Sequence, residues 1–165
     1  MAQSKIQVSM TNNKSKYLSY TEAWRRVKVA NEGGFYFEVV TLCESVISDR
    51  LLSYIRGVNT NSKAGIKTSF TVLIDEWRRL AAGTLPKHGP SDLGAAVEAW
   101  RDERNTVIHG LTKSMPGTGT EPVEPFIERA KSAARQGEAL AKAVSKWHKS
   151  EFLAHQRSSR PTLEQ

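Results

Sequence analysis

The sequence has only one cysteine, Cys43, among its 165 residues. A single thiol cannot close a disulfide within the chain, and this one lies in an apolar helical pattern, so we expect it in the core. Apolar runs that approach the roughly 18 residues of a membrane span are also missing. The polar residues 1–16 lack the apolar segment of a signal peptide. These absences lead us to expect a cytoplasmic protein with no membrane partner.

Strand-like alternation of apolar and polar residues is missing too, whereas apolar residues recur at helical spacing along most of the chain. We therefore expect an all-α fold, a compact antiparallel bundle of about five helices. Glycines and prolines separate the expected helices, which span 20–31, 35–56, 66–82, 92–109 and 126–155. Around a helical domain of residues 19–155 we expect a flexible basic arm at 1–18 and a polar tail at 156–165.

Two of the expected helix starts carry capping residues. Ser19 and Glu22 stand at the spacing of a capping box, which predicts that the first helix begins there. Ser91 is the expected N-cap of the fourth helix, with Asp92 in its first turn.

Lysine and arginine outnumber aspartate and glutamate by seven, and the isoelectric point is near 9.7. This excess favours a polyanionic partner such as RNA, although charge alone would equally suit a membrane surface or an acidic protein. The basic residues of the last expected helix either form a solvated face or guide RNA.

The segment Trp100–Gly110 holds the most informative pattern. Val97, Trp100, Arg104 and Ile108 recur at spacings of three and four, so Arg104 lies on an otherwise apolar stripe of its helix. Its stem can be buried there at little cost, but its guanidinium needs water, an anion or a carboxylate. This placement indicates a specific role for the charge.

His109 follows Arg104 by five residues, which is about 140° round a regular helix. Gly110 predicts a left-handed helix end directly after His109, where the chain can re-aim the imidazole. Asn105 lies four residues before His109, so we expect a hydrogen bond between the two side chains.

The run Arg104-Asn105-Thr106-Val107-Ile108-His109 resembles the Arg-x(4–6)-His signature of HEPN domains, in which a polar residue commonly follows the arginine. The resemblance in helix layout covers roughly residues 20–155. It implies a HEPN-like helical fold and a homodimer in which two copies of the motif face each other in one cleft. It also implies a stand-alone endoribonuclease that acts as a toxin or phage-defence effector. An antitoxin or another regulatory protein would then restrain it.

The chemistry expected of this pair is RNA cleavage without a metal or cofactor. A histidine changes its charge near neutral pH, so it can exchange a proton with a ribose 2′-hydroxyl or a leaving 5′-oxygen. Arginine can stabilise the charge that develops on the phosphoryl oxygens. The products would be a 2′,3′-cyclic phosphate and a 5′-hydroxyl, and DNA would not be cut.

Supporting residues follow from the same resemblance. HEPN domains often carry an acid on an early helix that orients the arginine or histidine, and Glu44 is our candidate, with Glu38 second. Thr106 adds a hydroxyl next to the motif or serves as a plain helical spacer. Leu111 occupies the position where some HEPN toxins carry a tyrosine that is adenylylated, so we do not expect that mode of control.

A rival interpretation is a non-catalytic helical module that binds RNA or a protein partner through its basic face. The presence of both Arg104 and His109 favours the enzyme. The other histidines, His88, His148 and His155, lack cysteine or carboxylate neighbours at ligand spacing, so we expect them to be solvent-exposed and no metal to be bound.

Overall fold

The computed structural model describes the backbone of residues 2–158 and the side chains of residues 14–155. The described part of the chain is mostly helical, with five helices and almost no strand, which confirms the expected all-α class. In chain order the elements are α1 (Ala2–Gly33), α2 (Tyr36–Val58), α3 (Phe70–Leu80), β1 (Lys87–His88), β2 (Ser91–Asp92), α4 (Leu93–Gly110) and α5 (Val123–Ser158).

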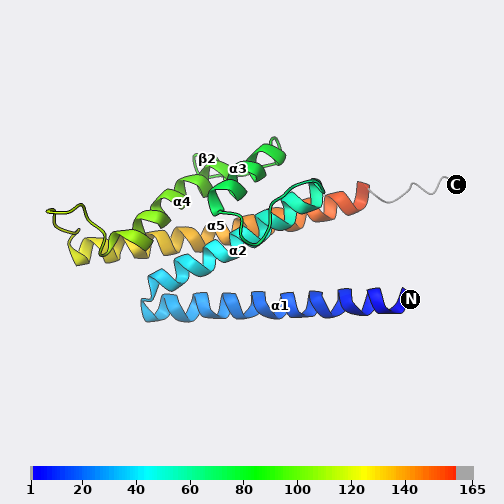
Figure 1. The fold of residues 1–165 in the computed structure, drawn as a ribbon, viewed down its shortest axis with the longest axis horizontal. Helices are drawn as coiled ribbons and strands as arrows, with labels where there is room; N and C mark the ends of the chain where they lie inside the picture. The colour runs from blue at the N-terminus through cyan, green and yellow to red at the C-terminus, as the bar shows by residue number, and fades with distance from the viewer. Residues whose placement is uncertain (1, 159–165) are drawn as a thin grey trace.

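Helix α2 is the central element of the bundle. It packs against each of the other four helices, while α4 also packs on α5 and on α3 (Figure 1). The core between them is built from aliphatic and aromatic side chains, including Ile47, Leu51, Trp77, Trp100 and Phe126, all almost completely buried. Removal of these apolar groups from water is the main force that holds the helices together. Cys43 lies among them with no exposed surface, as expected.

Helix α1 begins much earlier than the sequence predicts. It runs without a break from Ala2, so the predicted capping box at Ser19 is wrong. The Ser19 hydroxyl instead donates to the Ser15 carbonyl, 3.1 Å away, and Glu22 pairs with Arg25 at 2.7 Å in mid-helix. Residues 2–18 of the expected arm are therefore part of the first helix. Of the polar tail expected at 156–165, residues 156–158 continue α5, and the rest lies outside the described residues.

Two other helix starts differ from the expectation by a few residues. Helix α3 begins at Phe70 rather than Ile66, because the Ser69 side chain accepts a hydrogen bond from the Val72 amide and caps the helix there. Helix α4 is capped by Asp92, whose carboxylate accepts from the Ala95 amide at 2.9 Å. Ser91 is not the cap, because its hydroxyl donates to the Asp92 carbonyl at 3.3 Å and bonds no amide of the first turn of α4.

The end of α4 also departs from the prediction. Gly110 is part of the helix, and its backbone does not adopt the positive φ seen at Gly34, Gly83, Gly89 and Gly117. A Cβ at Gly110 would lie 2.9 Å from the Phe126 ring, so the glycine lets the start of α5 pack closely against α4. The expected left-handed stop is therefore wrong, and the glycine serves packing instead.

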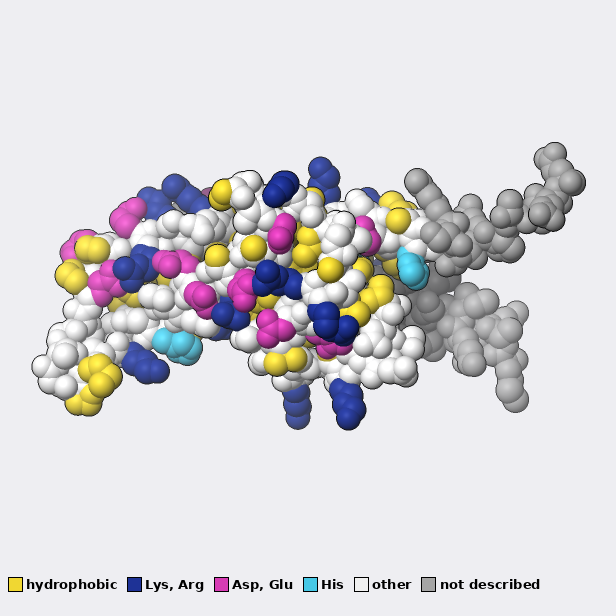
Figure 2. Space-filling view, turned by 90° about the horizontal axis from the view of Figure 1, so that it is seen from above, with side chains coloured by type: hydrophobic (Ala, Val, Ile, Leu, Met, Phe, Trp, Pro, Cys, Tyr) yellow, Lys and Arg dark blue, Asp and Glu magenta, His cyan; other side chains and the backbone are white. Residues whose placement is uncertain are grey.

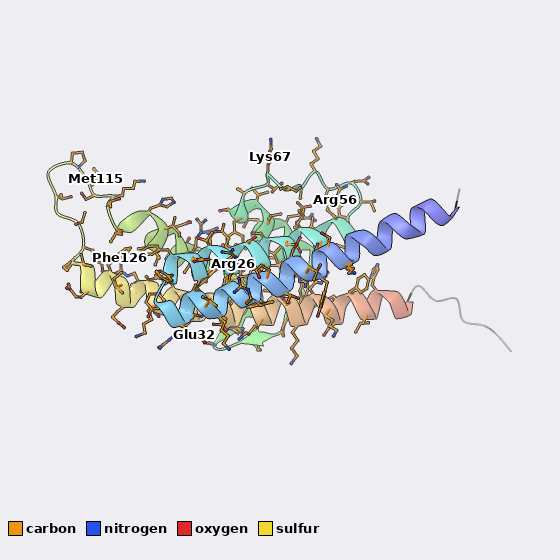
Figure 3. All side chains as sticks on the ribbon, turned by 90° about the horizontal axis from the view of Figure 1, so that it is seen from below. Arg26, Glu32, Arg56, Lys67, Met115 and Phe126 are labelled. Carbon is orange, nitrogen blue, oxygen red and sulfur yellow. The ribbon has the colours of Figure 1, made fainter. Side chains whose placement is uncertain are left out.

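The segment between α4 and α5 is a loop, as predicted, and its residues 111–120 are all exposed. Met115 marks how far this loop extends beyond the ends of the helices (Figure 3). Within the described part of the chain, no helix is both long and apolar enough to cross a membrane.

Candidate functional site

Arg104 and Glu44 meet between α4 and α2. The Nη2 atom of Arg104 forms an ion pair with Glu44 Oε2, and the two side chains are only 22% and 18% exposed. Arg104 follows the buried Val97 and Trp100 on the inward side of α4, which is the stripe that the sequence indicates. The arginine stem thus packs toward the core while its charge is balanced by the neighbouring helix.

The second candidate acid lies elsewhere. Glu38 is half-exposed near the first turn of α2, where its carboxylate is 3.6 Å from Arg26 of α1. Arg26 lies on α1 (Figure 3), so Glu38 joins α2 to α1 rather than to α4. Glu44, not Glu38, is therefore the acid that contacts Arg104.

Asn105 serves Arg104 rather than His109. Its side-chain oxygen accepts a hydrogen bond from Arg104 Nη1 at 2.7 Å, so the predicted hydrogen bond from Asn105 to His109 is not formed. The Nε atom of Arg104 is buried without a hydrogen-bond partner among the described residues. Nη1 and Nη2 of Arg104 are thus both bound within the chain, whereas the N–H group of Nε remains unpaired among the described residues.

His109 is exposed at the end of α4, and no hydrogen bond or ion pair to the described residues holds its ring. Because Gly110 continues the helix, the five-residue separation turns His109 about 140° away from Arg104. The expectation that Gly110 re-aims the imidazole is therefore wrong. One copy of the chain does not bring the two side chains together.

Thr106 is a helical spacer, which is one of its two expected roles. Its hydroxyl donates to the Asp102 carbonyl one turn earlier, at 3.1 Å, and the residue is exposed. This is the usual bond of a threonine inside a helix and leaves no free donor directed at Arg104.

A cleft of about 380 Å³ adjoins Glu44, between α2 and the segment that leads into α3. The hydroxyls of Ser45, Ser48 and Thr68 line it together with the carboxylates of Glu44 and Asp49. No sequence pattern indicates this cleft, because its walls lie about 20 residues apart in the chain. Acceptor groups of this kind suit hydroxyl and amino donors of a ligand rather than its phosphates.

No protein-family model, curated protein or solved structure matches this chain. What the site can do therefore follows from its own residues. Among the described side chains, no group of three or more histidine, cysteine, aspartate or glutamate residues is placed to hold a metal ion. The face in Figure 2 carries acidic and basic side chains side by side, so the net positive charge does not form a uniform patch there.

His148 contradicts the expectation of solvent exposure. It is half-buried on α5, and its Nε2 atom lies 3.2 Å from the Ser53 hydroxyl of α2. Burial, followed by the nearby Arg50, lowers the pKa of His148, while Asp49 opposes this shift. Sequence spacing offers no signal for this pair, because its members are 95 positions apart.

Proposed function

We propose that this protein is an endoribonuclease in which Arg104 and His109 are the catalytic residues. The observation that carries the proposal is the inward-facing Arg104 held by Glu44, five residues before an exposed histidine with no partner among the described residues. The residue types and spacing of this segment resemble the HEPN signature, and the helical fold is compatible with it. A role as toxin or phage-defence effector, restrained by an antitoxin or other regulatory protein, is part of the same proposal.

The reaction is a transesterification within RNA. The ribose 2′-oxygen attacks the adjacent phosphorus, a bond from phosphorus to that oxygen forms, and the bond to the 5′-oxygen breaks. A neutral histidine accepts the 2′-hydroxyl proton, and a protonated histidine supplies one to the departing 5′-oxygen. Arg104 binds the phosphoryl oxygens as their charge grows. A 2′,3′-cyclic phosphate and a 5′-hydroxyl remain.

A homodimer supplies what one copy lacks. The reaction needs a base and an acid, and one exposed His109 cannot easily be both in a single turnover. Since Arg104 and His109 diverge on a regular helix, we place the reacting phosphate between motifs from two copies, with one imidazole from each. The cleft beside Glu44 is lined by hydrogen-bond acceptors, which suit the ribose hydroxyls or base amino groups of the same RNA.

The test is cleavage of end-labelled single-stranded RNA and its DNA counterpart by the purified protein in EDTA. We expect cleavage of RNA alone, with cyclic phosphate ends. His109→Ala and Arg104→Ala should each lower the rate by about 10² to 10⁴-fold. His88→Ala and Arg101→Ala are matched controls that leave the rate unchanged. Monomeric protein by light scattering at micromolar concentration, or equal rates in all four variants, would refute the mechanism.

A second candidate is a non-catalytic module that binds RNA or a protein partner. One observation favours it: the Arg104 guanidinium is already engaged by Glu44 and Asn105, as a structural arginine would be. A protein that shifts RNA on a gel without cutting it, and is harmless when expressed, would support this candidate. Toxicity that His109→Ala abolishes would support the nuclease.

A further inference from the structure

A second cavity, of about 590 Å³, lies between α2 and α5. Arg50 on its α2 wall comes six residues after Glu44, about 120° away round the helix, so this cavity faces another side of α2. Its lining includes four basic side chains, two hydroxyls and one aromatic ring but no carboxylate: Arg50, Lys146, His148, Lys149, Ser53, Ser145 and Phe152. Two helices thus bring positive charge and hydrogen-bond donors to one place.

Two polar atoms of this cavity are not satisfied by the protein itself. Arg50 Nε and Ser145 Oγ are both buried without a hydrogen-bond partner among the described residues. Buried donors of this kind cost free energy unless a ligand or water satisfies them. Within the same part of the chain, Lys146 and Lys149 form no ion pair, and both are exposed at the rim.

No carboxylate among the described residues forms an ion pair with Arg50. Its guanidinium carbon lies 4.0 Å from the centre of the Tyr20 ring, a cation–π contact that fixes its position without neutralising it. The adjacent Asp49 is occupied in another direction, because it accepts from the Tyr20 hydroxyl at 2.5 Å and pairs with Lys16 at 3.0 Å. Arg50 is therefore held in place with its charge available.

We propose that this cavity binds a phosphate group, carried either by a free nucleotide or by the RNA backbone. A phosphate offers several acceptor oxygens on a compact anion, which matches donors arriving from Arg50, Ser145 and Lys149 on two helices. The exposed Phe152 at the edge offers a flat apolar surface on which a base can stack. The site is separate from Arg104 and does not depend on ribonuclease activity.

The test measures binding of inorganic phosphate to the full-length protein at constant ionic strength. Isothermal titration calorimetry gives the dissociation constant. The NMR signals of the histidine side chains report where the anion binds, and the His148 signals are assigned by their loss in His148→Gln. We expect phosphate to shift the His148 signals. Arg50→Gln should weaken binding about tenfold, and Lys149→Gln about threefold, because each removes a charged donor. Arg135→Gln is the matched control, because Arg135 is an exposed charge on α5 about 21 Å before Lys149, and it should not change the affinity.

Comparison of ligands separates the two sources of phosphate. If adenosine monophosphate binds more tightly than phosphate, and Phe152→Ala removes this difference in affinity, the cavity is a nucleotide site. An oligoribonucleotide without terminal phosphate that binds in an Arg50-dependent way identifies the RNA backbone. Phosphate that leaves the His148 signals unmoved, or that binds the Arg50→Gln, Lys149→Gln and Arg135→Gln proteins equally, would overturn the proposal. Since Lys149 is exposed, its variant remains informative even if Arg50→Gln does not fold.

Discussion

Neutralising Glu44 should destabilise the protein as well as affect its activity. Its ion pair with Arg104 is about four-fifths buried, since the side chains are 18% and 22% exposed. Exposed pairs contribute about 0.2–1 kcal/mol, whereas removal of one partner from a fully buried pair costs about 3–5 kcal/mol. We expect Glu44→Gln to lie between these limits, at about 2 kcal/mol. For a chain of this size, that lowers the Tm by about 4–8 °C.

A double-mutant cycle isolates the contribution of this ion pair. The free energy of unfolding is measured by urea denaturation for the original protein, Glu44→Gln, Arg104→Gln and the double variant. We expect a coupling of about 1–2 kcal/mol between the two positions, which persists at high salt because the pair is shielded from solvent ions. The exposed pair of Lys28 and Glu32 on α1 is the control, with a coupling of about 0.3–0.5 kcal/mol that salt removes. Effects at Glu44 and Arg104 that add within about 0.3 kcal/mol would refute the reasoning.

The buried surroundings of Cys43, Gly137 and His148 lead to three further predictions. Burial, reinforced by Glu138, raises the pKa of the Cys43 thiol to about 12, so a disulfide reagent near neutral pH should modify it only as fast as the protein unfolds. Rapid labelling of the folded protein would contradict this. Gly137→Ala should destabilise by about 1–3 kcal/mol in thermal denaturation, because the new Cβ would lie 2.5 Å from the Trp100 ring. Gly57→Ala, with nothing within 4 Å, should instead be neutral or stabilising by up to about 1 kcal/mol, and equal losses in the two variants would argue against the packing explanation. His148 has its pKa lowered from 6.5 in the folded protein, so the unfolded chain binds its proton more tightly. Stability should therefore fall as the pH drops through about 6.5 and level off below the folded pKa, and His148→Gln should weaken this dependence in denaturation measured from about pH 8 to pH 5.

Helical periodicity was enough to predict the class of fold and most of the core. Cys43, Val97 and Trp100 are buried as expected, because a stripe of apolar residues must face another element wherever it occurs. Periodicity also indicated that Arg104 lies on the inward side of α4. The identity of the acid opposite it rested on a family resemblance, and the structure places Glu44 there.

Helix ends were harder to predict because local signals compete with packing. Ser19 and Glu22 form a good capping pattern, yet the backbone before them continues the helix and their side chains bond within it. Glycine is a typical residue at a helix end, but Gly110 lies within α4, where it lets the Phe126 ring pack closely. Such contacts join residues far apart in the chain, and a single sequence does not reveal them.

The cavity between α2 and α5 escaped prediction for the same reason. Ser53 and His148 are brought together only when the two helices pack, and neither has a recognisable pattern along the chain. No sequence pattern distinguishes Arg50 from the other basic residues. Its significance comes from the Tyr20 ring beneath it and the absence of an acid in the cavity lining.

The central position of α2 has a consequence for how the molecule opens. The helix contacts all four others, so no single neighbour can detach and expose its backbone. Its amide hydrogens should therefore exchange with solvent deuterium only when the whole bundle unfolds, whereas those of the loop at residues 111–120 exchange through local fluctuations. The slowest amides of α2 would then report the global stability directly, without denaturant.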